Sequence, residues 1–311
     1  MSLERFRQAA IVTVVGLCVV VVAGGVVRLT GSGLGCDDWP NCNSERFVDV
    51  SSGHTAIEQI NRLASVLLGI PTLIMAVGSF RVRPRGRRLV APSLIVLFSV
   101  LANGVVGGIA VRGDLHPALV QSHFLLAMVS ITFALIAADR ARPAVDNSQD
   151  EIASPVGIRV QVWAIGVLTG VALVTGTVVT GTGPHAGDEE ARRWGLDISN
   201  VAKIHSVSVL VTIGAALILI WSIRRGSGVR RRLSSPLSTW MFIALLQGGI
   251  GYLQYFNEIP ELLVGTHIAG ATALWVATVQ LVLATSAHTG AKPTIDEAGE
   301  MQVSDLAAGT V

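Results

Sequence analysis

Three histidines lie near the start of long apolar segments: His123, His205 and His267. A coordinating or ionisable side chain in a membrane-length apolar segment is costly, and it usually has a function. Imidazoles from two facing helices can hold a haem iron from both axial sides. Taken alone, each histidine could equally be a structural residue whose ring nitrogens are hydrogen-bonded. However, His205 and His267 are 62 residues apart in the sequence. Asn61 and His123 are the same distance apart in the sequence, and this repeated spacing favours a haem site.

The segments that contain Asn61 and His205 differ in their other polar residues. Residues 53–63 read GHTAIEQINRL, whereas the later segment reads NVAKIHSVSVL. An iron between two histidines has no vacant site and suits electron transfer. An iron held by His123 alone keeps one face open for oxygen chemistry. The first half of the chain is therefore the candidate catalytic half.

Glu58 is the candidate catalytic residue, because a carboxylate beside an open iron face could deliver or remove protons. Arg62 could pair with a haem propionate, which favours a permanently charged, bidentate donor. Asn61 is a supporting residue in this interpretation. The alternative is a structural ion pair between Glu58 and Arg62, at positions i and i+4 of a helix, which is also compatible with a structural Asn61.

Two of the three cysteines lie six positions apart, in the segment GLGCDDWPNC. Cys36 and Cys42 are good disulfide partners in an oxidising compartment, and the glycine and proline around them permit a tight loop. A redox-active pair, or half of a metal site, is the alternative. Cys18 stands alone within an apolar segment and is most simply a small buried residue.

The remaining histidines lie outside the apolar segments. His54, His116 and His185 fall in predicted loops and His288 in the tail, where histidines are more often exposed than ligating. His54 lies one or two helical turns before Asn61 and could approach the same pocket. Six glycines could leave room for a porphyrin or allow close helix packing; they are at 104, 107, 108, 248, 249 and 251.

The composition predicts a polytopic membrane protein. The chain has 311 residues, of which 51% are hydrophobic and 14% charged, and its mean hydropathy is +0.60. Its apolar runs approach about 20 residues, the length that crosses a hydrocarbon core as a helix, and they lack the alternation of barrel strands. We expect an all-α fold with eight transmembrane helices, near 9–29, 57–79, 90–111, 118–138, 160–180, 203–223, 236–256 and 262–285.

Arginine placement predicts the orientation of these helices. The breaks RVRPRGRR and RRGSGVRRR carry five arginines each, and more arginines lie before the first helix and in the 139–159 segment. All of these segments fall on one side of an eight-helix chain, so that side, with both termini, is predicted to be cytoplasmic. Contacts with lipid or nucleic acid are the less favoured explanation, and we expect no nucleic-acid partner. The first apolar run lacks a cleavage site and is expected to be retained.

Internal repetition predicts the architecture. ANGVVGGIAV at 102–111 and LQGGIGYLQY at 246–255 align at an offset of 144 residues, which also aligns His123 with His267 and Asn61 with His205. Each repeat has four helices, an even number, so both repeats enter the membrane from the same side. This parallel duplication argues against transporters with inverted repeats.

The repeat sets the predicted domain boundaries. Residues 1–138 form an N-terminal four-helix bundle, which is the candidate catalytic half. Residues 139–159 form a cytoplasmic linker, and residues 160–285 form a C-terminal four-helix bundle that carries the histidine pair. Residues 286–311 are polar and are expected to be a disordered cytoplasmic tail.

These combined features resemble the haem A synthase family over about residues 8 to 285. The resemblance implies oxidation of the C8 methyl of haem O, through a hydroxymethyl group, to the formyl group of haem A for terminal oxidases. It also implies that His205 and His267 ligate a haem b and that Glu58, Arg62 and His123 serve the substrate half. Cys36 and Cys42 would then form or exchange a disulfide.

Two features depart from the family pattern. Members commonly have a histidine where this chain has Asn61, so the first half lacks one expected axial ligand. Many members also carry a second cysteine pair in the third outward loop, where this chain reads PHAGDEEARRWGLD. We expect either that this branch does without a second disulfide or that His185 and the local charges hold the loop in another way.

The resemblance also suggests partners and a location. Haem O would arrive laterally from haem O synthase through the lipid bilayer of a bacterial-type plasma membrane. The electron donor is not identified by the sequence, and a homo-oligomer is compatible with it. A di-haem b electron carrier that is linked to quinol is the alternative function, although Asn61 counts against it. A transporter with parallel repeats would need polar residues near the bilayer midplane, whereas the candidates here lie near the outer face.

Overall fold

The computed structural model describes residues 1–83, 86–142, 154–224 and 226–286, and every element within these ranges is a helix. In chain order the helices are α1 (Leu3–Leu29), α2 (Gly53–Ser79), α3 (Gly86–Arg112), α4 (Pro117–Arg140), α5 (Val156–Thr182), α6 (Ile198–Ile223), α7 (Ser227–Phe256) and α8 (Glu261–Leu283). The prediction of an all-α polytopic membrane protein is confirmed. Residues 143–153 of the predicted linker and residues 287–311 of the predicted tail lie outside the described residues.

Most helices begin several residues before their predicted starts, and in α1, α2 and α6 a polar residue caps the helix ahead of the apolar segment. Ser2 accepts a hydrogen bond from the backbone N–H of Arg5 at the start of α1. Ser52 and Asp197 cap α2 and α6 in the same way. A side-chain oxygen at this position satisfies one of the free N–H groups of the first turn.

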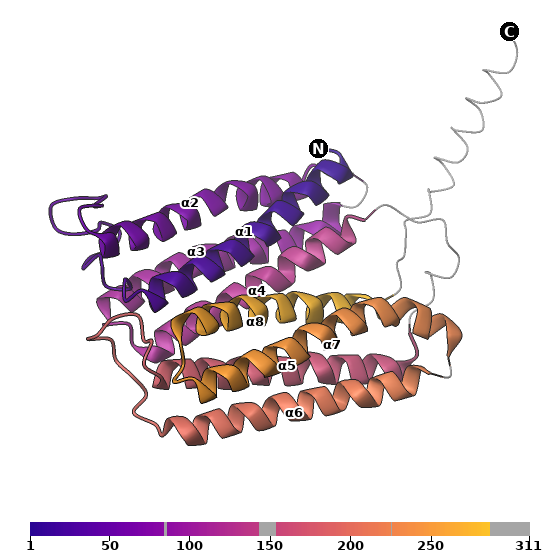
Figure 1. Ribbon diagram of the computed structural model, residues 1–311. Coiled ribbons are helices and arrows are strands. Elements are labelled where there is room, and N and C mark those ends of the chain that lie inside the picture. Colours follow the sequence, from indigo (N-terminus) through magenta and orange to yellow (C-terminus); the bar gives the residue numbers. More distant parts are fainter. Residues whose placement is uncertain (84–85, 143–153, 225, 287–311) are drawn as a thin grey trace, which may run out of the picture.

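One predicted span differs from the rest in composition. Seven of the eight helices are long and apolar enough to cross a membrane, and α7 is the one that is not among them. It has 30 residues, a length of about 45 Å at about 1.5 Å per residue, but Gln247 and several glycines dilute its apolar segment. Helix α7 packs against α6 and α8 and runs the length of the second group of helices (Figure 1).

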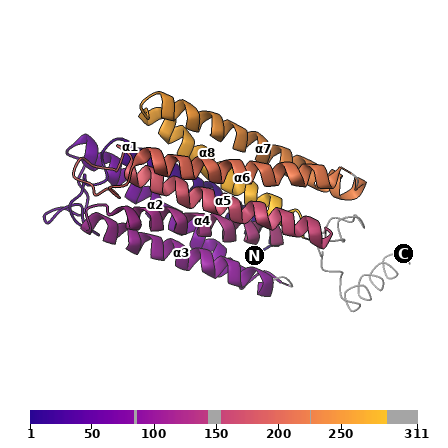
Figure 2. The same cartoon turned by 90° about the horizontal axis from the view of Figure 1, so that it is seen from below.

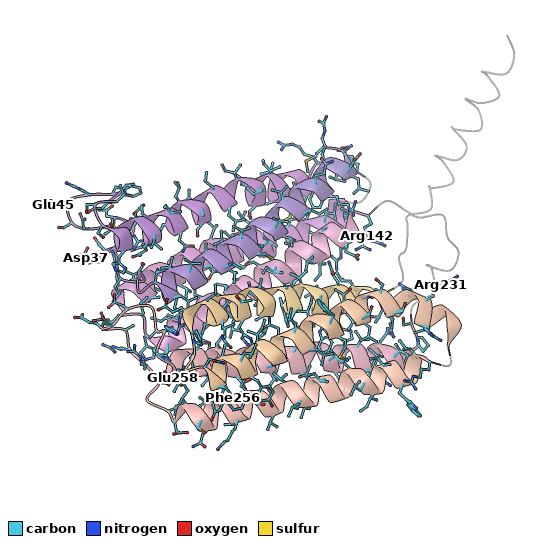
Figure 3. The ribbon with its side chains drawn as sticks, in the orientation of Figure 1. Asp37, Glu45, Arg142, Arg231, Phe256 and Glu258 are labelled. Atoms are coloured by element: carbon cyan, nitrogen blue, oxygen red, sulfur yellow. A yellow bond between two sulfur atoms is a disulfide. The ribbon has the colours of Figure 1, made fainter. Side chains whose placement is uncertain are left out.

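The helices form two groups of four that lie side by side, α1–α4 and α5–α8 (Figures 1 and 2). Helix α8 packs against both α1 and α4, and α4 also packs against α5. Figure 3 shows Asp37, Glu45 and Glu258 at one end of the helices and Arg142 and Arg231 at the other. We call the first the loop end, because residues 30–52 and 183–197 lie there, and the second the arginine end.

The buried core repeats with the same spacing as the sequence. Leu89 and Leu233 are both fully buried, and they are 144 residues apart, as are the fully buried Met75 and Leu219. Each group of helices therefore packs around its own core, with equivalent residues at the centre. The two groups are joined by polar contacts such as that of Trp275, whose indole N–H donates to the hydroxyl of Thr132 at 3.0 Å.

Trp240 offers a test of this packing. It is fully buried, and its indole N–H donates to the hydroxyl of Thr278 on α8 at 2.9 Å. We expect Trp240→Ala to lower the free energy of unfolding by about 3–5 kcal/mol, because it leaves a cavity. Trp240→Phe should cost only about 1 kcal/mol, the scale of one hydrogen bond between membrane helices.

Thermal unfolding of the purified protein in detergent measures both effects. Trp163→Ala is the control, because Trp163 is 60% exposed on α5. Equal melting temperatures for the Trp240→Ala and Trp163→Ala proteins would contradict the packing described here.

Candidate haem sites

His205 of α6 and His267 of α8 face each other near the loop end of the second group of helices. Their ring centroids are 6.4 Å apart, and their planes are nearly perpendicular, at 82°. A metal–imidazole bond is about 2.0–2.1 Å long, so two such bonds with half of each ring span roughly 6 Å. The two imidazoles therefore fit the spacing of axial ligands on a single iron, which is the way a haem b would be held.

Glycines make room for both imidazoles. A Cβ atom on Gly176 of α5 would lie 3.1 Å from Cε1 of His205, and one on Gly251 of α7 would lie 3.5 Å from Cε1 of His267. The first distance is tighter than an ordinary contact, so a larger residue at Gly176 would displace the ring. These flanking helices thus supply space where α6 and α8 carry the candidate ligands.

The tautomer of His205 follows from its hydrogen bonds. Its Nδ1 lies 3.1 Å from Oγ1 of Thr175, whose hydroxyl donates to the carbonyls of Val171 and Ala172, both at 3.0 Å. The only proton of the Thr175 hydroxyl is directed at these carbonyls, so the hydroxyl oxygen accepts from Nδ1–H of His205. Nε2 of His205 is then unprotonated, as an iron ligand requires. Nδ1 of His267, by contrast, is buried and has no hydrogen-bond partner among the described residues.

The first group of helices carries one imidazole at the equivalent depth. A Cβ on Gly107 of α3 would lie 3.1 Å from Cε1 of His123 on α4. The side-chain oxygens of Asn61 and Asn103 are buried, and the described part of the chain offers them no partner. Buried polar atoms are normally hydrogen-bonded, so these two oxygens, one on α2 and one on α3, are free to interact with a ligand.

Glu58 and Arg62 form the ion pair that the sequence allowed as an alternative. Arg62 donates to Oε1 of Glu58 from Nε at 3.0 Å and from one terminal nitrogen at 2.6 Å. Its other N–H groups donate to the carbonyls of Asp38 and Asn41, at 3.0–3.1 Å. All five donors of the guanidinium thus have partners, and pairing with a propionate would require some of these bonds to break.

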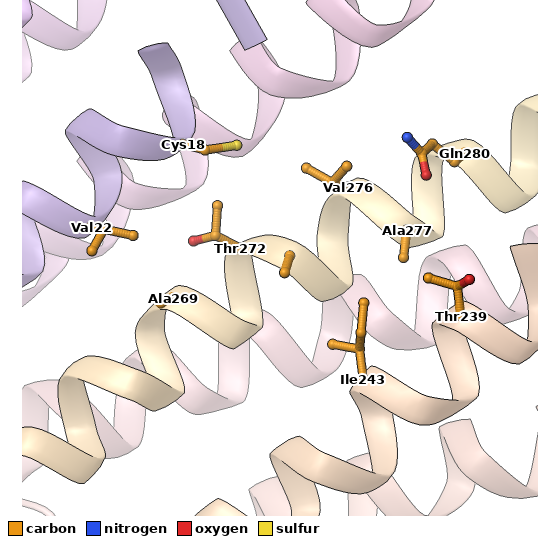
Figure 4. A pocket seen from close by; sticks show the side chains of 10 residues that line it. Cys18, Val22, Thr239, Ile243, Ala269, Thr272, Val276, Ala277 and Gln280 are labelled. Carbon is orange, nitrogen blue, oxygen red and sulfur yellow. The ribbon is translucent and has the colours of Figure 1, made fainter. Parts of the chain in front are cut away.

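The cysteine prediction is confirmed: Cys36 and Cys42 form a disulfide with an S–S distance of 2.02 Å. Glu58 fixes the start of the loop that this bond closes, because its Oε2 accepts from the backbone N–H of Cys36 at 2.7 Å. The only free cysteine among the described residues is Cys18, which is partly buried. It borders an apolar cavity of about 340 Å³ between α1, α7 and α8, away from all the histidines (Figure 4).

Arg28, at the end of α1, is a residue that the sequence analysis missed. Its guanidinium donates to the carbonyl of His185 at 2.6 Å and to that of Thr180 at 2.8 Å. Nε2 of His185 in turn lies 2.8 Å from the carbonyl of Ile259. This chain of bonds holds the 183–197 loop, which has no disulfide, and a cation at the end of an apolar run was the signal that could have identified Arg28.

The other predicted loop histidines have structural partners. Nδ1 of His54 lies 3.0 Å from the hydroxyl of Ser32, so this histidine holds the start of α2 to the loop after α1. His116 accepts from the backbone N–H of Ala118 at the start of α4. In the described residues, no cluster of three or more His, Cys, Asp and Glu side chains could hold a metal ion by itself.

Known proteins resemble this chain over most of its length. The chain matches the family model described as cytochrome oxidase assembly protein, COX15-CtaA, over residues 7–56 and 45–279. It is 25% identical over 291 residues to a protein named heme A synthase from Symbiobacterium thermophilum, a match that covers 88% of this chain and 93% of that relative.

Relatives of the same name from Bacillus mycoides and Bacillus cereus are 29% identical over 136 residues. These matches span 43% of this chain and 44% of the Bacillus proteins, which is less than half of their length. The family model covers most of the chain. The chain therefore belongs to the cytochrome oxidase assembly protein family, COX15-CtaA.

Proposed function

We propose that this protein oxidises haem O to haem A. The observation that carries the proposal is the asymmetry between its two halves. One half presents a pair of imidazoles, His205 and His267, at the spacing of axial ligands. The other presents His123 with a buried, unpartnered oxygen of Asn61 where the second imidazole would be. The relatives named heme A synthase support the same activity.

The two proposed sites have different roles, electron transfer and substrate binding. His205 and His267 would hold a haem b, which would supply electron transfer. Thr175 and Gly176 hold His205 in the ligating tautomer and position. His123 holds the iron of the substrate, haem O, from one side and leaves the other side open.

The proposed reaction has two steps on one methyl group. With dioxygen as oxidant, each step takes up one O2, two protons and two electrons and releases one water. The first converts the methyl group into a hydroxymethyl group, and the second gives a geminal diol that loses a further water to form the aldehyde. The electrons enter through the haem b half from a donor still to be identified.

Glu58 is the proposed source of protons for these steps. It is 4% exposed, and it is the only buried acidic residue in the helices that the structure describes. Its partners are Arg62 and the backbone N–H of Cys36. They hold the carboxyl group at a defined position near the loop end, so it can both anchor the loop and exchange a proton.

The membrane setting fits a substrate with a farnesyl tail. Haem O would diffuse laterally from haem O synthase, and this explains why the enzyme lies in a bilayer. We place the arginine end and both termini in the cytoplasm of a bacterial-type cell, by the excess of arginine on that side. A homo-oligomer is compatible with the extensive apolar surface of the helices.

Extraction of haem tests the activity directly. The protein is expressed with and without a haem O synthase, and the extracted haems are separated by chromatography. We expect haem A and its hydroxymethyl precursor only when both proteins are present. If ample haem O gives neither product, the proposed activity is wrong and a haem b electron carrier becomes the better description.

Substitution of the histidines tests the division between the halves. We expect His205→Ala and His267→Ala each to lower the bound haem b by roughly tenfold or more, because an axial ligand is lost. His123→Ala should leave haem b in place and abolish conversion of haem O. The low-spin haem b absorption spectrum measures the first effect, and His116→Asn is the control. Loss of haem b from the His123→Ala protein would contradict the assignment.

A glutamine at position 58 separates the two roles of Glu58. Glu58→Gln keeps an oxygen that can accept from Cys36 but removes the proton-transfer group, so we expect turnover to fall by roughly a hundredfold or more. Haem b content and the disulfide should be unchanged, as measured by absorption and by thiol titration. Glu261→Gln, an exposed carboxylate in the first turn of α8, is the matched control. Full turnover in the Glu58→Gln protein would leave Glu58 a purely structural role.

A further inference from the structure

Trp39 lies against α3 beside the imidazole of the catalytic half. A Cβ on Gly108 would lie 2.5 Å from Cδ2 of Trp39, so the indole sits directly on the backbone of this glycine. The preceding residue, Gly107, makes the equivalent contact with His123 at 3.1 Å. Successive residues of a helix point about 100° apart, so the indole and the imidazole cover adjoining faces of the same turn of α3.

The loop that carries Trp39 is anchored to two helices. From α2, Arg62 donates to the carbonyls of Asp38 and Asn41, both within 3.1 Å. From α3, Arg112 donates to the carbonyl of Trp39 and, at 3.1 Å, to Oδ1 of Asp38. The Cys36–Cys42 disulfide joins the two ends of the loop.

Asp38 fixes the orientation of the tryptophan. Its Oδ1 accepts from the backbone N–H of Trp39 at 2.6 Å. This bond, followed by the interaction with Arg112, lowers the pKa of Asp38 below its usual value. The carboxylate is therefore charged at neutral pH, and Trp39 is held from its N–H, its carbonyl and its ring.

The second half of the protein builds this region differently. At the offset of 144 residues, Gly108 corresponds to Tyr252 and Arg62 to Ser206. There the aromatic ring comes from α7 itself, and the hydroxyl of Tyr252 lies 3.4 Å from that of Ser206. The catalytic half thus has a glycine on the helix and receives its aromatic ring from a covalently closed loop.

We propose that Trp39 forms the wall of the haem O pocket between α2 and α3 and sets the in-plane orientation of the porphyrin. The proposal rests on the proposed function and extends it to selectivity. A porphyrin of this type carries several methyl groups of similar reactivity, and one axial bond leaves the ring free to rotate about the iron–nitrogen axis. A flat, rigid side chain at the edge of the ring removes this freedom, and Arg62 and Arg112 act as positioning residues for it.

Two variants, each with a matched control, test whether Trp39 lines the haem O pocket. Trp39→Ala removes the indole, and Gly108→Ala displaces it while favouring the helix. Trp194→Ala is the matched control for the first, because Trp194 lies in the other loop and covers Gly181 at 2.8 Å in the same way. Gly214→Ala is the control for the second, because Gly214 lies within α6 of the other half and a Cβ there would have no atom within 4 Å.

The measurements are the affinity for haem O without oxygen, by absorption titration, and the positions oxidised in its presence, by mass spectrometry of the extracted haems. We expect both test variants to bind haem O roughly three- to tenfold more weakly, the scale of one aromatic contact. They should also lose turnover or oxidise methyl groups other than the C8 methyl. Both controls should match the wild type, and Trp39→Phe should recover most of the affinity.

The outcomes separate this inference from the proposed function. Haem b content and the Cys36–Cys42 disulfide report correct folding, because neither depends on the indole. If the wild type makes haem A and both test variants bind and oxidise haem O in the same way, Trp39 is not part of the pocket. If the wild type itself makes no haem A, the proposed function fails first, and the role of Trp39 fails with it.

Discussion

Every polar side chain among the helices must find its partner within the protein, because the hydrocarbon core offers no water to satisfy it. Hydroxyl groups meet this need by donating to carbonyls one turn earlier, and Trp240 and Trp275 meet it across helices. Arg62 uses all five of its donors on one carboxylate and two carbonyls. Against this background the buried, unpartnered oxygens of Asn61 on α2 and Asn103 on α3 are informative, since they are free to interact with a ligand.

Duplication explains how one scaffold holds two different sites. The fully buried residues keep their spacing of 144, so both halves pack their helices in the same way. The differences are concentrated near the loop end, where His205 is replaced by Asn61 and Tyr252 by Gly108. Changes at these positions alter what the pocket holds without disturbing the core, because they lie one or more turns beyond it. A site for a resident cofactor and a site for a substrate can therefore share the same fold.

The sequence was sufficient for the fold because long apolar runs and arginine-rich breaks leave few alternatives. It was also sufficient to pair His205 with His267, because the repeat supplied an internal comparison. The sequence could not show that every N–H group of Arg62 is hydrogen-bonded. Several of the acceptors are backbone carbonyls of a loop, which any residue type could have supplied. Thr175 and Gly176 were missed for a related reason: small residues are common throughout membrane helices, and only their contact with His205 distinguishes them.

A substrate site must bind its ligand and also release the product, which limits how tightly it can hold the iron. Two imidazoles, as in the second half, would bind the iron firmly and close both of its faces. In the proposed substrate site Asn61 takes the place of one imidazole, so more of the binding free energy would have to come from the edge of the porphyrin. The indole of Trp39, held by its anchored loop, could provide such contacts. Asn61 and the anchored loop that carries Trp39 would thus act together in the proposed site: the first weakens the hold on the iron, and the second holds the edge of the porphyrin.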